Sequence, residues 1–221
     1  MNNKFNLELD LVNVFMSNYK KIEKEIVVTE MPIRFGNIDI VSIKNMNLPF
    51  SDEQIKVLSR PAGALVFAKI KNERPISKAK LSVSFGLSQS TLDNTLYELL
   101  NCKLIYKEED NYYRAVKFVF PKTIVTGYEA KLKDFNKAFY QAKGNKEYVD
   151  YSYLVFPFEA AKNILEKKND LLHDNGIGLI GVSETKVKLF LRAKKSAKMK
   201  NHIRLLNIAK ANVIVSKEVI G

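Results

Sequence analysis

The hydrophobic pattern of this 221-residue chain changes twice, near Asn45 and near Pro121. Before the first point and after the second, short runs rich in Val, Ile and Thr alternate with amphipathic segments. This alternation is typical of strands and helices in an α/β domain. Between them the chain is mainly helical and ends in two short strands. Because a chain of this length holds one large domain or two small ones, the pattern predicts an α/β domain interrupted by an inserted second domain.

The middle segment predicts helix, turn, helix and hairpin in that order. Ser51-Asp52-Glu53-Gln54 has the pattern of a capping box that opens a helix, and another helix is predicted over 61–70. Residues 77–100 predict a short helix, a Gly-Leu turn and a second helix. Two strands follow over 104–107 and 112–120, with an acidic hairpin tip between them.

This order resembles a winged helix-turn-helix domain over roughly residues 49–121. The resemblance implies that the second helix, capped by Ser88, places its first residues in the major groove of DNA. A role in protein contacts or dimerisation is the alternative, and the acidic tip counts against a hairpin lying on phosphates. The implied DNA-binding residues are Lys78 and Lys80 in the first helix, Gln89, Ser90, Thr91 and Asn94 in the second, and Lys107 and Arg114 in the hairpin.

The flanking segments predict the α/β domain itself. Strands joined through helices pair in parallel by right-handed crossovers, so the segment after Pro121 predicts a sheet flanked by helices. The expected helices cover 7–23, 135–148, 159–172 and 203–211; two strands lie within 25–43, and further strands cover 123–132, 151–157, 176–183 and 186–191.

The charge of the chain indicates a polyanionic partner. Lys and Arg number 36 and Asp and Glu 24, a formal charge of +12, which makes nucleic acid the first candidate. Lys195, Lys198 and Lys200 near the C-terminus are candidates for contact with the DNA backbone, or else form a solvated face. A single cysteine excludes a disulfide framework and a thiolate zinc site. With no apolar run near the roughly 18–20 residues that cross a bilayer and no signal core, we expect a cytoplasmic protein without membrane contact.

Three residues of the flanking segments are candidates for catalysis or metal binding. Glu129 and Lys131 lie two apart on a predicted strand and therefore share a face, although a surface ion pair worth ~0–1 kcal/mol also explains such a pair. Asp39 follows a turn at the start of an apolar strand. Beside Glu129 it would supply two hard oxygen ligands of the kind Mg²⁺ prefers. Because such oxygens lie about 2.0–2.6 Å from the ion, carboxylates more than ~10 Å apart would rule out a shared metal.

This combination resembles the PD-(D/E)XK nuclease superfamily, with its restriction-endonuclease-like mixed sheet flanked by helices. The acid after a turn, the Glu-Ala-Lys strand, the helix and the Ser-Tyr strand match in order, over roughly residues 5–45 and 122–190. Two departures stand out: Ile38 rather than Pro precedes Asp39, and the whole middle segment separates Asp39 from Glu129. The resemblance therefore implies a nuclease-like domain interrupted by a winged helix.

The resemblance also implies individual roles. Asp39 and Glu129 would coordinate Mg²⁺ or Mn²⁺ with the backbone carbonyl of Ala130, and Lys131 would position the attacking water or stabilise the transition state. Auxiliary candidates are Glu8, Glu30 and Gln141. The structural alternatives are a solvated helix residue, which is favoured for Glu8, a salt bridge or edge position for Glu30, and a helix-surface amide for Gln141.

The expected domains are 1–46 and 122–221 for the nuclease-like part, with a basic C-terminal tail, and 47–121 for the inserted part. Two functions stay open. One is a metal-dependent DNA endonuclease or DNA-processing nuclease that hydrolyses phosphodiester bonds; the other is a DNA-binding regulator whose nuclease-like domain is inactive. Asp39, Glu129 and Lys131 together favour the nuclease, because a protein that only binds DNA has no need of all three. Cutting both strands of a duplex requires two sites, so a homodimer is a further expectation.

Overall fold

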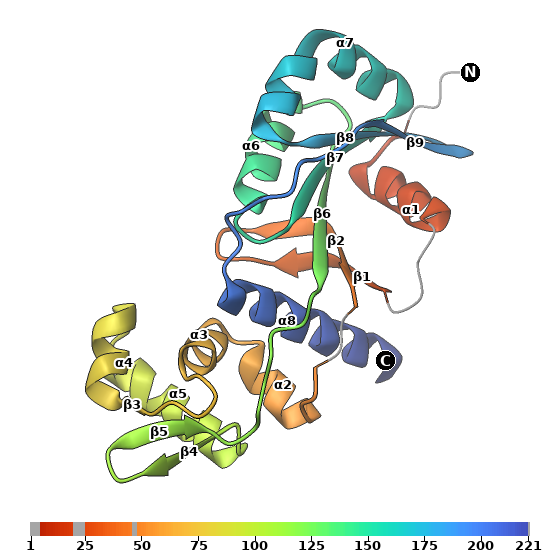
Figure 1. The fold of residues 1–221 in the computed structure, drawn as a ribbon. Helices are drawn as coiled ribbons and strands as arrows, with labels where there is room; N and C mark the ends of the chain where they lie inside the picture. The colour runs from red at the N-terminus through yellow and green to blue at the C-terminus, as the bar shows by residue number, and fades with distance from the viewer. Residues whose placement is uncertain (1–4, 20–24, 46–47, 221) are drawn as a thin grey trace. The chain divides into compact units, whose positions relative to one another are not determined.

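The structure is a computed structural model that describes residues 5–19, 25–45 and 48–220 (Figure 1). It contains two compact units. Unit 1 holds the described residues of 1–46 and 123–199, and unit 2 holds those of 47–122 and 200–221. The α/β class with a mixed sheet flanked by helices is confirmed.

Unit 1 is built around a six-stranded sheet in the order β1-β2-β6-β7-β8-β9. Strands β6, β7 and β8 are parallel, as the strand–helix alternation predicted, whereas β1, β2 and β9 are antiparallel to their neighbours. The elements are α1 (Glu8–Asn18), β1 (Glu25–Pro32), β2 (Asn37–Lys44), β6 (Ile124–Ala130), α6 (Phe135–Asn145), β7 (Tyr151–Pro157), α7 (Phe158–Asn175), β8 (Gly178–Ser183) and β9 (Lys186–Leu191).

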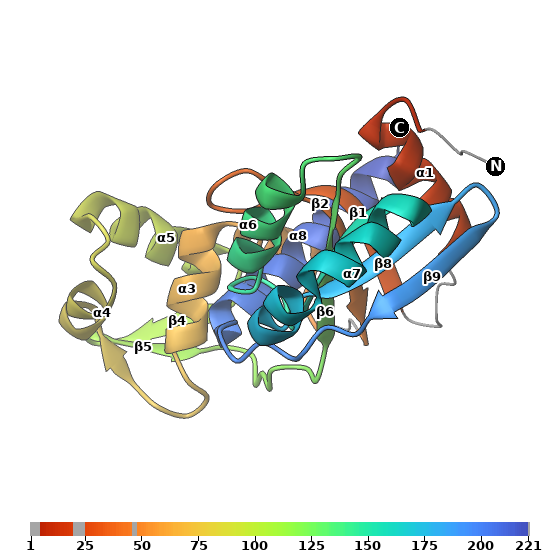
Figure 2. The ribbon, with the colours of Figure 1, turned by 90° about the horizontal axis from the view of Figure 1, so that it is seen from above.

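The sheet of unit 1 lies between two helical layers. Tyr128 and Ala130 of β6 pack with Phe15 of α1, whereas Leu154 of β7 packs with Phe139 of α6 on the other face. Figure 1 shows α6 and α7 on one side of these strands and α1 on the other. In Figure 2, which views the molecule from above, α7 runs along the sheet. Because side chains alternate along a strand, the residue between Tyr128 and Ala130 points toward α6.

Unit 2 combines helices with a three-stranded antiparallel sheet in the order β3-β5-β4. The predicted caps are confirmed: Ser51 and Ser88 each accept a hydrogen bond from a backbone N–H of the first turn, and Gly86 ends α4 with a φ of 60°. The elements are α2 (Asp52–Leu58), α3 (Pro61–Lys69), β3 (Ile76–Ser77), α4 (Lys78–Phe85), α5 (Gln89–Asn101), β4 (Ile105–Glu108), β5 (Asn111–Arg114) and α8 (Asn201–Ile220).

The C-terminal helix differs from the prediction in length and in place. Helix α8 runs over Asn201–Ile220, far beyond the expected 203–211, and it belongs to unit 2 rather than to the segment 122–221. The reason is apolar packing, since Leu205, Leu206 and Ala209 are buried in the core of unit 2. The residues after 199 are therefore not a tail of unit 1.

Two further elements end earlier than predicted. The strand expected over 112–120 stops at Arg114, because Phe118 turns into an aromatic cluster with Phe50 and Phe67. The first helix, expected over 7–23, ends at Asn18, and residues 20–24 lie outside the described part of the chain. None of the described helices combines the length and apolar composition that spanning a bilayer requires.

Candidate active site

Strands β2 and β6 bring together two acidic residues that are distant in sequence. The strands are antiparallel, and Ile40 pairs with Tyr128, so Asp39 lies beside the end of β6. Asp39 is held there because its Oδ2 accepts a hydrogen bond of 2.8 Å from the backbone N–H of Ala130. The carboxylate of Asp39 thus meets Glu129 at one edge of the sheet.

The ammonium group of Lys131 lies among three carboxylates. Its Nζ is 3.5 Å from Glu129 Oε1, 3.6 Å from Asp39 Oδ2 and 3.0 Å from Glu8 Oε2. It also donates a hydrogen bond of 2.9 Å to the carbonyl of Ala130. Because the Asp39 and Glu129 oxygens both lie within 3.6 Å of one atom, their separation cannot exceed twice that distance. This is below the ~10 Å limit for carboxylates that share a metal.

Burial perturbs the titration of all three groups. Glu129 is fully buried, and burial, followed by the charge of Asp39, raises its pKa to about 7 despite Lys131 and a hydrogen bond from Asn145. Burial also raises the pKa of Asp39, against the opposing effects of the Ala130 N–H and Lys131. For Lys131, burial lowers the pKa, but the charges of Asp39, Glu129 and Glu8 outweigh it and the net shift is upward. Perturbed groups gathered in this way are typical of functional sites.

The site offers some of the oxygen ligands that a hard divalent cation requires. Glu129 Oε1 is buried and, apart from its ion pair with Lys131, has no hydrogen-bond partner among the described residues. With Asp39 it offers the carboxylate oxygens that Mg²⁺ and Mn²⁺ prefer. The carbonyl of Ala130 accepts a hydrogen bond from Lys131, which leaves one of its two lone pairs for a metal ion. Within the described ranges, no group of three acidic, His or Cys residues has the arrangement of a complete metal site. Asp39 and Glu129 therefore fit as ligands, and the remaining ligands would be the Ala130 carbonyl and water or substrate oxygens.

The auxiliary candidates lie at different distances from this centre. Glu8, in the first turn of α1, contacts Lys131 directly. Glu30 accepts a hydrogen bond of 3.1 Å from Asn37, and its charge contributes to the raised pKa of Asp39. Gln141, on α6, has a buried Oε1 for which the described residues supply no partner.

Asn145 is a site residue that the sequence analysis missed. It is buried in the last turn of α6, and its Nδ2 donates a hydrogen bond of 3.2 Å to Glu129 Oε2. Its position four residues after Gln141 places both amides on one face of the helix. That spacing is the signal that could have identified it.

A groove opens beside the carboxylates, between the β1–β2 turn and α6. Its volume is about 570 Å³. The turn supplies Asn37 and the helix supplies Gln141 and Asn145. Because Asn145 donates a hydrogen bond to Glu129, the groove extends to a residue that contacts the buried carboxylate. The full lining is Ile33, Arg34, Phe35, Gly36, Asn37, Tyr140, Gln141, Gly144, Asn145, Glu147 and Tyr148.

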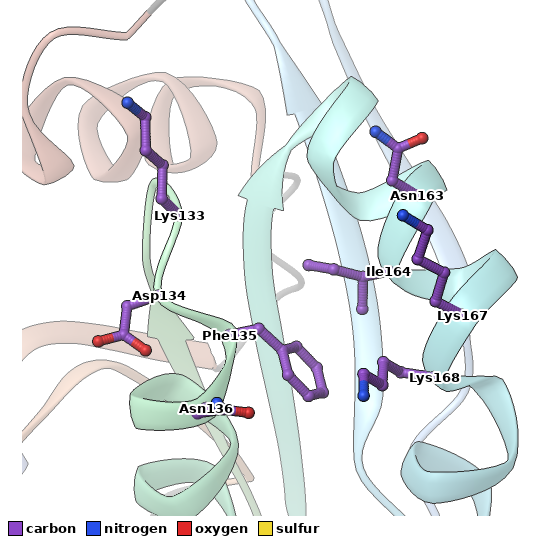
Figure 3. Close-up of a pocket in the computed structure, with 8 residues that line it drawn as sticks. All are labelled: Lys133, Asp134, Phe135, Asn136, Asn163, Ile164, Lys167 and Lys168. Atoms are coloured by element: carbon purple, nitrogen blue, oxygen red, sulfur yellow. The ribbon is translucent and has the colours of Figure 1, made fainter.

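A second hollow, of about 450 Å³, lies between the start of α6 and α7 (Figure 3). Figure 3 shows Phe135 and Ile164 pointing into the gap between the two helices, with Lys167 and Lys168 on the α7 side. Lys133, two residues after Lys131, lines the same hollow. Three ammonium groups against the one carboxylate of Asp134 leave this hollow with a positive charge that would attract phosphate, and none of the three lysines was predicted from the sequence.

The candidate DNA-binding residues of unit 2 are mostly exposed, but two of them already have an acidic partner. Lys78 Nζ lies 2.6 Å from Asp93 Oδ1, and the amide of Gln89 is 3.3 Å from both oxygens of the same carboxylate. Ser90 and Thr91 contact the hydroxyl of the helix cap. Exposed side chains belong to Lys80, Asn94 and Lys107 in unit 2, to Lys195 and Lys198 in unit 1, and to Lys200 in unit 2.

Arg114 lies inside unit 2 rather than on a DNA-facing surface. Its guanidinium donates hydrogen bonds to Asn72 Oδ1 and to the carbonyls of Phe67 and Phe118. The group lies over the Phe67 ring, 4.7 Å from its centroid, and burial lowers its pKa to about 10. These contacts give Arg114 a structural role, so we leave it out of the proposed DNA interface.

Comparison with known proteins finds no relative for this chain. No family model, no curated protein and no solved structure matches it. The functional argument therefore rests on the geometry described above.

Proposed function

We propose that the protein is a metal-dependent DNA nuclease of the PD-(D/E)XK type, with a winged-helix DNA-binding unit inserted between its acid strand and its Glu-Ala-Lys strand. The observation that carries this proposal is the convergence of Asp39 and Glu129 on the ammonium of Lys131. Holding a buried glutamate, a partly buried aspartate and a buried lysine together costs desolvation free energy, and catalysis is a reason to retain such a cluster.

The order of elements in unit 1 supports the proposal. Helix α1 is followed by β1, β2 and β6 as antiparallel neighbours, then by α6 and the parallel strand β7. This is the order that the resemblance implied for the nuclease fold, once the inserted unit is set aside. Asp39, Glu129 and Lys131 lie where β2 begins and β6 ends. Asp39 is on β2, Glu129 is on β6, and Lys131 directly follows β6.

The residues of the site have separable tasks. A divalent ion bound by Asp39 and Glu129 would offset charge on the phosphoryl oxygens and lower the pKa of a bound water. Lys131 supplies a fixed cation for the same phosphate, in a site where burial strengthens its field. Glu8 is about half exposed and bonds the lysine from the α1 side, so it would orient the ammonium, and its charge contributes to the raised pKa of Asp39.

Unit 2 supports DNA binding through its helix pair. Gly86 makes the turn between α4 and α5, and the first two turns of α5 expose Gln89, Ser90, Thr91 and Asn94. An exposed helix start with amide side chains is suited to reading base edges in the major groove. The overall charge of +12 would favour association with DNA.

The regulator is the second candidate, and one observation favours it. The ammonium of Lys131 already compensates the carboxylates and donates a hydrogen bond to the carbonyl of Ala130. An ion-pair network of this kind can be purely structural. A regulator with this site would bind DNA through unit 2 and would neither bind a divalent ion at Asp39 nor cut.

A cleavage assay separates the two candidates. The full chain is incubated with plasmid, linear, single-stranded and branched DNA, with Mg²⁺, Mn²⁺ or EDTA. Wild type should cut only with metal, and Asp39→Asn should abolish cutting while DNA affinity and the thermal unfolding transition stay close to wild type. Glu166→Gln, an exposed change on α7, is the matched control and should cut normally. Absence of cutting with every metal, together with no heat of divalent-ion binding, would establish the regulator instead.

A further inference from the structure

The groove between the β1–β2 turn and α6 carries two exposed aromatic side chains. Phe35, at the turn, is 80% exposed, and Tyr140, on α6, is 71% exposed. Both line the groove, and the guanidinium of Arg34 lies 5.1 Å from the centroid of the Phe35 ring. Aromatic rings left in solvent beside a cation are the elements from which nucleic-acid-binding proteins build stacking platforms.

The polar groups of the groove suit the edge of a base. Asn37, Gln141 and Asn145 each carry an amide, which can both donate and accept hydrogen bonds, although Asn37 already donates to Glu30 and Asn145 to Glu129. The Oε1 of Gln141 is buried and lacks a partner within the described residues, so a donor on a ligand could satisfy it. The volume of about 570 Å³ falls in the range of about 300–1,000 Å³ typical of small-molecule sites.

The groove is connected to the carboxylates on two sides. Asn145 lines it and donates to Glu129, and Asn37 lies two residues before Asp39 on the same face of β2. A nucleotide whose base enters the groove would therefore have its phosphate near the carboxylates. A base inside a duplex is stacked on both faces and cannot reach a side-chain platform, whereas an unpaired or extruded base can.

We propose that this groove holds one unpaired nucleobase of the substrate strand, stacked on Phe35 and Tyr140. The substrate class is then DNA with unpaired nucleotides at the cleavage position, such as single strands, flaps or branches, rather than continuous duplex. This inference rests on the proposed nuclease function, because it places the phosphate beside Asp39 and Glu129.

The test is a binding measurement that does not depend on cleavage. The full chain, in EDTA, is titrated into a single-stranded oligodeoxynucleotide with a central 2-aminopurine, and into the fully paired duplex of the same sequence. Wild type should quench the 2-aminopurine in the single strand and not in the duplex. Because stacking on an aromatic side chain is worth ~1–3 kcal/mol per base, Phe35→Ala and Tyr140→Ala should each weaken single-strand binding by roughly 5- to 150-fold. Duplex affinity should stay within twofold of wild type.

A second variant tests the groove without removing a ring. A Cβ added at Gly144 meets no atom within 4 Å, so a side chain can begin there without a clash, and Gly144→Leu is expected to fill groove space. It should reduce quenching as the aromatic variants do. Leu171→Ala removes an exposed apolar side chain from α7, outside the groove, and is the matched control.

The outcomes separate this inference from the proposed function. Quenching lost in the groove variants, with Asp39→Asn still quenching, supports the groove even if no DNA is cut. Cutting of duplex by wild type that is unchanged in Phe35→Ala, without quenching of any single strand, overturns the groove and leaves the nuclease. Equal losses on single strand and duplex also overturn it. Tighter binding of the matching RNA strand than of DNA would overturn the assignment of DNA as the substrate.

Discussion

Replacing Glu129 by Gln is expected to stabilise the metal-free protein at neutral and alkaline pH. The Glu129 carboxylate is fully buried, and burial together with Asp39 raises its pKa to about 7. Gln has nearly the same shape and keeps an oxygen that can accept the hydrogen bond from Asn145. The variant therefore removes a buried charge without opening a cavity.

The size of the effect follows from the pKa of this one carboxyl group. The ordinary value is 4.5, and the folded protein holds the proton until about pH 7. Between these values the folded state binds more protons than the unfolded state, so the free energy of unfolding falls as the pH rises. A shift of this size corresponds to at most about 3 kcal/mol, present below the lower pKa and lost above the higher one.

Urea unfolding followed by far-ultraviolet circular dichroism measures this difference. In EDTA, wild type should lose stability relative to Glu129→Gln between about pH 5 and pH 8, and the exposed change Glu166→Gln should follow wild type. Adding Mg²⁺ should reverse the trend for wild type and for Glu166→Gln but not for Glu129→Gln, because the ion binds the ionised Glu129 carboxylate. Identical pH profiles for wild type and Glu129→Gln in EDTA would refute the reasoning.

Four further changes test other parts of the structure. Lys131→Ala should retain metal binding by calorimetry but slow single-turnover cleavage by ~10²–10³, as for a lost transition-state donor. Arg114→Ala should lower the free energy of unfolding by about 2–4 kcal/mol, because three hydrogen bonds are lost inside unit 2. Lys167→Glu with Lys168→Glu should weaken all DNA alike and flatten the salt dependence of binding, seen by fluorescence anisotropy. Asn94→Ala should change base discrimination by ~1–3 kcal/mol in competition binding, whereas an equal loss on all sequences would indicate no base contact.

The sequence predicted the elements and their pairing well where the signal is local. Caps at Ser51 and Ser88 and the parallel strands β6, β7 and β8 follow from neighbouring residues and from chain order. The meeting of Asp39 with Glu129 has no local signal, since the whole inserted unit separates them. It was expected only through the resemblance to a nuclease family.

Tertiary packing decided the features that the sequence analysis missed. Arginine is a residue type that often contacts phosphate, so the sequence suggested a surface position for Arg114. Its position inside unit 2 depends on the Phe67 and Phe118 rings packed around it. Asn145 ends an ordinary amphipathic helix, and its role depends on a carboxylate from β6. The length of α8 reflects its packing in the apolar core of unit 2. The lysine-rich residues before α8 obscured the hydrophobic pattern of the helix in the sequence.

The pairing of Lys44 with Ile124 has a consequence for how the chain reaches its native state. Closing β2 against β6 joins the two ends of a very long loop, and the entropy of that closure is smaller once the loop has collapsed on itself. The inserted segment is thus expected to condense before the central strands of the sheet meet. Yet that segment lacks α8 until residues 201–220 have been synthesised. Every strand of the six-stranded sheet precedes α8 in the chain, so the core of unit 2 can be completed only after all the strands of unit 1 have been synthesised.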